Sequence, residues 1–228
     1  MISVHRSSLR ASAARFVAVG ALVLSVACGQ AGSPAGGNTA DAPDTANFVR
    51  GTMVTGETWQ FRACDRDIEL PLHAADIVVR NVLDELSAGG GELYVEFNGR
   101  VGGRVPAMTM TRLHYAARDT AGCGADALAE EYRAQGNEPF WSVTVEAETV
   151  TWRTPEQIDG VEFTLAMREL VGDGLLLRAE NVDGQLEASF AATACRDTMA
   201  DAWFGYTVQV QYEGEVFYGC GRRGRGPR

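Results

Sequence analysis

The chain has 228 residues, of which 46% are hydrophobic, and a formal charge of −10. Such an acidic body argues against a nucleic-acid partner, because DNA and RNA are bound through positive charge. There are only three histidines, no Gly-x-Ser-x-Gly motif and no metal-site spacing of cysteines, which argues against serine and zinc hydrolases. We therefore expect no catalytic residue, no metal and no cofactor.

Residues 1–27 have the layout of an export signal. The segment begins with the basic residues Arg6, Arg10 and Arg15 and no acid, continues with an apolar run over residues 16–26, and ends in small residues. That run is about half of the ~20 residues that a membrane-spanning helix requires. We expect the signal to be removed rather than to persist as a transmembrane anchor.

The end of this signal, Leu24-Ser25-Val26-Ala27-Cys28, resembles the lipobox of bacterial lipoproteins. The common lipobox has Leu three places before the cysteine, whereas here Ser25 has that place and Leu24 lies one place earlier. The resemblance implies cleavage before Cys28, a thioether from its sulfur to diacylglycerol, and acylation of the freed amine, for example with palmitate. Several acyl chains anchor stably, whereas one binds reversibly. The alternative is an ordinary secretory signal with Cys28 unlipidated.

Residues 28–47 are mostly Gly, Ala, Ser, Pro, Thr, Asn and Asp. Such a composition cannot form a core, so we expect a disordered tether. Gly29 stands where some bacteria use Asp to retain lipoproteins in the inner membrane. We therefore expect a lipid-anchored protein of the bacterial cell envelope, at the outer membrane and facing the periplasm.

Four cysteines follow Cys28, namely Cys64, Cys123, Cys195 and Cys220. An even number in an oxidising compartment predicts disulfides. Of the three pairings available we favour Cys64 with Cys123 and Cys195 with Cys220, because each bridge then closes a loop inside its own half of the chain. Each would stabilise the fold by about 2–4 kcal/mol.

Residues 48–120 predict a small αβ module. Apolar residues recur at helical spacing over residues 74–86, and three glycines at 89–91 end that pattern. Alternation of apolar and polar residues predicts strands, over residues 49–53, 57–61, 93–97 and 108–115.

Strict alternation would place Met108, Met110, Arg112 and His114 on one face of the last of these strands. That face suits either core packing or a soft-metal site of the copper-sensing kind, and we favour core packing.

Residues 121–221 predict a β module. We expect a short helix over residues 125–133 that stops at Gly136. Alternation then predicts strands, over residues 141–146, 150–152, 161–167, 174–179, 185–192, 206–212 and 215–218. Three Asp-Gly dipeptides among them supply the positive φ angles of tight turns. Such a series of short antiparallel strands predicts a small barrel or a sandwich, so the fold class is mainly β (α+β).

The most distinctive sequence motif lies between the expected helix and the first of these strands. Pro139 keeps Glu138 out of the helical region, so the chain must turn sharply there. The segment is interpreted either as a fold-specifying corner with core aromatics, which we favour, or as a ligand-facing rim that uses Asn137, Glu138 and Trp141.

The hexapeptide Gly136-Asn137-Glu138-Pro139-Phe140-Trp141 also carries a resemblance, together with the downstream segments Cys195-x-Asp197-x-Met199, Tyr206-Thr207-Val208 and Gly219-Cys220-Gly221. These motifs resemble a family of uncharacterised bacterial membrane-associated lipoproteins, over about residues 132–221. Members of that family often have Ser where this chain has Ala200. The segments Phe61-x-x-Cys64 and 93–99 resemble the small barrel-like modules that accompany such domains, including that of the copper-stress lipoproteins. The resemblance implies no activity, substrate or catalytic residue.

The chain ends in an Arg-rich segment, residues 222–228. We expect a solvated tail that neutralises part of the acidic body; the alternative is docking to anionic lipid or wall polymer.

The sequence therefore favours a non-enzymatic envelope module that binds an envelope protein, a cell-wall partner or a small ligand. Two other functions are considered. The first is an envelope enzyme whose carboxylate-based site gathers Glu138, Asp197 and Arg196. The second is inhibition of lysozyme-like wall-cleaving enzymes, for which the chain carries no inhibitor motif.

Replacing Cys28 with alanine tests the anchor. Cys28→Ala should release a soluble periplasmic protein, because the lipid can no longer be attached. Fractionation of envelopes followed by immunoblotting measures the release, and Cys64→Ala is a control that leaves the anchor in place. Full retention of Cys28→Ala in the membrane fraction would contradict the anchor.

Overall fold

The computed structural model describes residues 47–118, 120, 122–124 and 130–226. The expected signal, Cys28 and nearly all of the tether lie outside the described residues. Within them the chain is mainly β with one α-helix, which confirms the expected fold class. No described helix has the length and hydropathy needed to span a membrane.

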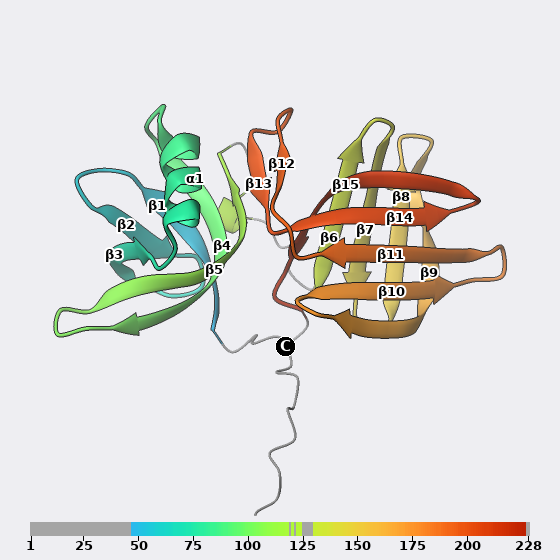
Figure 1. Ribbon diagram of the computed structural model, residues 1–228, viewed down its shortest axis with the longest axis horizontal. Helices are drawn as coiled ribbons and strands as arrows, with labels where there is room; N and C mark the ends of the chain where they lie inside the picture. Colours follow the sequence, from blue (N-terminus) through green and yellow to red (C-terminus); the bar gives the residue numbers. More distant parts are fainter. Residues whose placement is uncertain (1–46, 119, 121, 125–129, 227–228) are drawn as a thin grey trace, which may run out of the picture. The chain divides into compact units, whose positions relative to one another are not determined.

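The first module is a closed ring of five strands with one helix (Figure 1). The elements are β1 (Phe48–Val54), β2 (Trp59–Ala63), β3 (Glu69–Ala74), α1 (Ile77–Ser87), β4 (Glu92–Gly102) and β5 (Ala107–Ala117). The ring closes because β4 pairs with both β1 and β5, while β3 pairs with β5 in parallel. A five-stranded barrel in this order, with its helix between the third and fourth strands, has the topology of an OB fold.

Helix α1 begins at a capping residue and is held by its apolar face. The side chain of Asp76 accepts a hydrogen bond of 2.6 Å from the backbone N–H of Val78, which satisfies a donor that the first turn leaves unpaired. Leu83 and Leu86, three residues apart, are buried in the core of the ring. The helix starts three residues later than the expected 74–86, because Ala74 still pairs with Met110 in the sheet.

Strand β5 overturns the expected shared face of Met108, Met110, Arg112 and His114. Its pairing with β4 skips Thr111 and then His114, so each of these is a bulge residue. Each bulge adds one residue and reverses which side chains face inward. Met108 and Met110 therefore lie in the core of the ring, whereas Arg112 and His114 do not.

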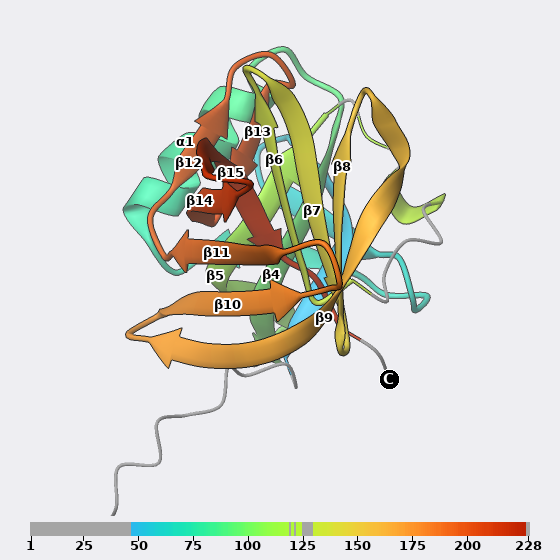
Figure 2. The same ribbon diagram turned by 90° about the vertical axis from the view of Figure 1, so that its right-hand side faces the viewer.

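The second module is a closed barrel of eight antiparallel strands. These are β6 (Tyr132–Asn137), β7 (Phe140–Glu146), β8 (Thr149–Thr154), β9 (Gln157–Val171), β10 (Gly174–Glu180), β11 (Gln185–Ala191), β14 (Tyr206–Tyr212) and β15 (Glu215–Arg223). Figure 2 shows β7, β8 and β9 following one another around it. Large side chains fill the interior, among them Trp141, Trp152 and Phe190, so the barrel encloses a packed core. Of the two folds that the strand series predicts, the structure shows the barrel and not the sandwich.

The prediction of a helix over residues 125–133 is wrong for the end of that segment, which forms a strand. Residues 125–129 lie outside the described part, and Tyr132 begins strand β6. Tyr132 pairs with Val145 on one side and with Arg223 on the other, so two ladders of hydrogen bonds override the local helical pattern. Gly136 is an ordinary strand residue and does not end a helix.

A short hairpin interrupts the barrel between β11 and β14. Its strands are β12 (Cys195–Asp197) and β13 (Ala202–Phe204), and β13 pairs with β5 of the first module. The hairpin therefore extends the first sheet with residues that belong to the second half of the chain.

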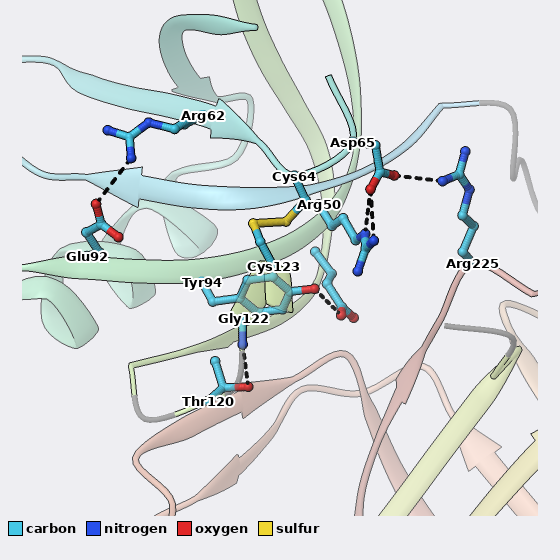
Figure 3. Close-up of a disulfide and its surroundings, with 11 residues drawn as sticks. Arg50, Arg62, Cys64, Asp65, Glu92, Tyr94, Thr120, Gly122, Cys123 and Arg225 are labelled. Atoms are coloured by element: carbon cyan, nitrogen blue, oxygen red, sulfur yellow. Dashed lines mark hydrogen bonds and ion pairs between the residues drawn. A yellow bond between two sulfur atoms is a disulfide. The ribbon is translucent and has the colours of Figure 1, made fainter. Parts of the chain in front are cut away.

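The disulfides are the pairs favoured from the sequence. Cys64 is bonded to Cys123, the central residue of the 3-10 turn Gly122–Gly124 (Figure 3). Cys195 is bonded to Cys220, which ties the hairpin to β15. The second bridge closes a loop within the second half of the chain, as expected, and it also joins the two sheets.

The expected solvated tail differs from the structure. Arg222 and Arg223 are the last residues of β15, and Arg223 is buried. Arg222 forms an ion pair with Glu96 of β4, a carboxylate with no exposed surface. Arg225, beyond the strand, forms an ion pair of 2.7 Å with Asp65 (Figure 3). A buried carboxylate needs a compensating cation, and this requirement holds the end of the chain against the first module.

Replacing Arg222 with methionine should lower the free energy of unfolding by about 3 kcal/mol, because Glu96 would be left buried without a cation. Arg178→Met is the matched control, since Arg178 pairs with Glu187 on the exposed barrel surface. Chemical denaturation monitored by tryptophan fluorescence measures both variants. Equal effects of the two changes would contradict the assigned importance of the buried pair.

Candidate functional site

The three residues of the expected rim, Asn137, Glu138 and Trp141, have different surroundings. Asn137 is the last residue of β6, Glu138 lies in the turn, and Trp141 is the second residue of β7. Trp141 is 4% exposed and stacks on Trp152, with 5.5 Å between ring centroids and 13° between ring planes. Trp141 is therefore mainly a core residue, and this favours the corner interpretation for it.

Two glycines explain how the indole of Trp141 fits at the end of the barrel. A Cβ atom on Gly136 would lie far inside van der Waals contact with the indole nitrogen of Trp141. A Cβ on Gly219 would lie 2.9 Å from the indole ring and would also clash with the carbonyl oxygen of Gln135. The ring lies directly on the backbones of β6 and β15, so Gly136, Gly219 and Trp141 form one packing unit.

Asp197 joins the hexapeptide to the inserted hairpin. Its Oδ1 accepts hydrogen bonds from Asn137 Nδ2 at 2.9 Å and from the backbone N–H groups of Met199 at 3.0 Å and Ala200 at 3.2 Å, and its Oδ2 accepts one from Gln135 Nε2 at 3.3 Å. Burial raises the pKa of this carboxyl, but the hydrogen bonds outweigh burial and hold the pKa below its usual value. The first two of the resembling motifs therefore meet in space.

An open hollow of about 420 Å³ lies beside this corner. It is lined by ends of β6, β7, β8 and β9, with the residues Gln135, Gly136, Asn137, Phe140, Trp141, Ser142, Arg153, Thr154, Pro155 and Ile158. The side chains of Phe140 and Ile158 are 54% and 78% exposed. Because Trp141 faces the core, alternation turns Phe140 outward, and this signal could have identified Phe140 from the sequence. Nothing in the local pattern identified Ile158 or Arg153.

The hollow combines apolar contact with a few polar groups. Arg153 supplies the positive charge, and its guanidinium donates a hydrogen bond of 3.4 Å to the hydroxyl of Thr144. Amides and the hydroxyls of Ser142 and Thr154 supply other polar atoms of its lining. Neither a histidine nor a carboxylate is among the lining residues, so the described hollow offers binding contacts but no acid/base pair.

The three groups of the enzyme alternative do not converge. Arg196 forms ion pairs with Glu85 of α1 at 2.5 Å and with Asp201 at 3.2 Å. Asp197, its neighbour in the strand, faces the amides of β6. Within the described residues Glu138 makes no hydrogen bond or ion pair, and no group of three potential metal-ligating His, Cys, Asp or Glu residues is found.

Comparison with protein-family models, with curated proteins and with solved structures finds no match to this chain.

Replacing Asp197 with asparagine should lower the free energy of unfolding by about 2 kcal/mol. The amide NH2 group would face at least one of the four donors that now bind the carboxylate, and two donors cannot pair. Thermal unfolding followed by circular dichroism measures the change. The loss should shrink as pH falls toward the lowered pKa of Asp197, because its carboxylate contributes stability above the unfolded pKa and loses it on protonation.

Asp159→Asn is the matched control, since Asp159 is an exposed residue of β9. A loss in Asp197→Asn no greater than that in the control would contradict the network.

Proposed function

We propose that this chain is an exported envelope lipoprotein, anchored through Cys28 at the outer membrane and facing the periplasm, that acts by binding a partner protein. The partner would place an apolar side chain in the hollow beside Phe140 and Ile158. The observation that carries the proposal is the exposure of these two large apolar side chains at the edge of a preformed hollow.

The chemistry of the hollow favours a protein over a wall fragment. Protein interfaces are centred on a few apolar or aromatic anchors surrounded by polar groups. Phe140, Ile158 and Pro155 supply apolar contact, while Gln135 and Ser142 supply polar atoms beside it. Wall glycans expose mainly hydroxyl and amide groups, which would leave this apolar surface in contact with water.

The rigid base of the hollow supports binding without reorganisation. Trp141 is fixed on Gly136 and by stacking on Trp152, and Asn137 is fixed by Asp197. A preformed surface loses little conformational entropy on binding. The expected tether between Cys28 and the barrels would give the site reach from the membrane.

A photo-crosslinking amino acid at position 140, in the lipidated protein in intact envelopes, tests the proposal. We expect a discrete crosslinked product from position 140 and none from position 182, where Val182 is fully exposed on another part of the barrel. Adding Ile158→Ser should lower the yield by about tenfold, because burial of an Ile side chain contributes about 1.5–3 kcal/mol. Val182→Ser is the matched control for that change.

Equal products from the two positions, or a product that Ile158→Ser leaves unchanged, would contradict a partner seated in the hollow.

A further inference from the structure

A second cavity lies between the two barrels and has different chemistry from the hollow. Its volume is about 240 Å³, and residues of β4 and β5 line it together with residues of β6, β9, β14 and β15. The residues that matter for its chemistry are Asn98, Arg112, His114, Asp173 and Arg223. Polar and charged groups therefore come from both modules.

His114 is the most deeply buried of these groups, at 1% exposed. Its Nε2 lies 3.0 Å from the side-chain oxygen of Asn98, so Nε2 carries the proton and donates it to that oxygen. Burial, with the positive charges of Arg112 and Arg223, lowers the pKa of His114 to about 3, so the imidazole is neutral near pH 7.

The other ring nitrogen, Nδ1, is then a hydrogen-bond acceptor. It is buried and has no partner among the described residues. Buried polar atoms are almost always hydrogen-bonded, and an unpaired one is costly. The group that would satisfy Nδ1 is a donor, such as a hydroxyl.

Arg112 adds a positive charge to the same cavity. Its guanidinium lies 5.8 Å from the ring centroid of Tyr206 and forms no ion pair with a carboxylate of the described chain. Arg223 is a second guanidinium in the lining, and Asp173 is its one carboxylate. The cavity is thus more positive than negative, in a chain whose formal charge is −10.

The bulges of β5 bring these groups together. A regular strand would have directed Arg112 and His114 to the same side as Met108 and Met110, into the core of the five-stranded ring. Because the pairing with β4 skips Thr111 and His114, the side chains of Arg112 and His114 lie on the lining of the cavity instead. Bulges are common where a strand must re-aim a side chain at a functional site.

We propose that this cavity binds a small hydroxylated anion of monosaccharide size, such as a sugar acid or a sugar phosphate. Its anionic group would be held by Arg112, and an adjacent hydroxyl would donate a hydrogen bond to His114 Nδ1. Asp173 is placed to accept hydrogen bonds from other hydroxyls. A volume of 240 Å³ lies below the range of about 300–1,000 Å³ typical of drug-sized ligands, which matches a single sugar ring.

Four probes separate the two features of the ligand. Titration calorimetry of the mature protein should show that glucuronate, glucose 6-phosphate or both bind at least about tenfold more tightly than glucose, which lacks the anion, and propionate, which lacks the hydroxyls. Preference for glucuronate identifies a carboxylate ligand, and preference for glucose 6-phosphate identifies a phosphate ester. Arg112→Gln should weaken binding by about tenfold, whereas Arg178→Gln, an exposed arginine on the barrel, should not.

Nitrogen NMR of labelled histidine gives a readout that does not depend on a variant's folding. The better-binding sugar anion should shift the Nδ1 resonance of His114 and leave that of His73, which lies on β3, unchanged. The proposal is overturned if neither sugar anion binds, if glucose or propionate binds equally well, if Arg112→Gln binds as the native protein does, or if Nδ1 does not respond.

Discussion

Glu96 has no exposed surface, and the ion pair that compensates its charge determines how the rest of this fold can be arranged. Burying a carboxylate costs several kcal/mol unless a cation and hydrogen bonds compensate it. Arg222 supplies the cation from the last strand of the second barrel, and the hydroxyl of Tyr94 donates a hydrogen bond of 2.8 Å. Burial and the neighbouring Glu96 raise the pKa of Tyr94, so this hydroxyl keeps its proton and remains a donor. The first barrel thus buries a charge that a cation of the second barrel neutralises.

The same dependence appears in the neighbouring contacts. The guanidinium carbon of Arg222 lies 4.8 Å from the ring centroid of Tyr115 in β5, and one of its nitrogens lies 3.8 Å from the carboxylate of Glu130. The hairpin of β12 and β13 extends the first sheet, and the bridge from Cys195 to Cys220 returns it to β15. Ionic and covalent links therefore converge on β15, while a backbone ladder joins the hairpin to β5. The two modules are better understood as one cooperative unit than as independent domains joined by a linker.

The sequence predicts those features that depend on local pattern. Strands of the second barrel follow from alternation, and helix α1 follows from its apolar spacing. The disulfide pairs follow from an even cysteine count with a preference for loops inside one half of the chain. The failures come from long-range pairing. No residue near Thr111 indicates that the pairing with β4 skips it, so alternation predicts the wrong face for His114. Tyr132 lies in a helical pattern, yet Val145 and Arg223 recruit it into a sheet. The buried pair formed by Arg222 spans 126 positions of sequence, and the Arg-rich composition of the segment alone indicated solvent.

The expected rim illustrates the same limit at the level of the site. The local motif around Pro139 singled out Asn137, Glu138 and Trp141. The structure uses Trp141 and Asn137 to build the corner and leaves Phe140 and Ile158 to face outward. A motif can therefore be distinctive because it specifies a structural support, while the exposed apolar side chain lies one residue away. The inter-barrel cavity extends this reasoning, because its acceptor and its cation reach the lining only through irregularities of β5. Selection for a stable ring alone would favour a regular strand with apolar residues at 112 and 114. The two bulges place Arg112 and His114 on the lining of one cavity. They cost free energy, because ladder hydrogen bonds are lost and one ring nitrogen of His114 stays unpaired. A bound ligand would offset that cost.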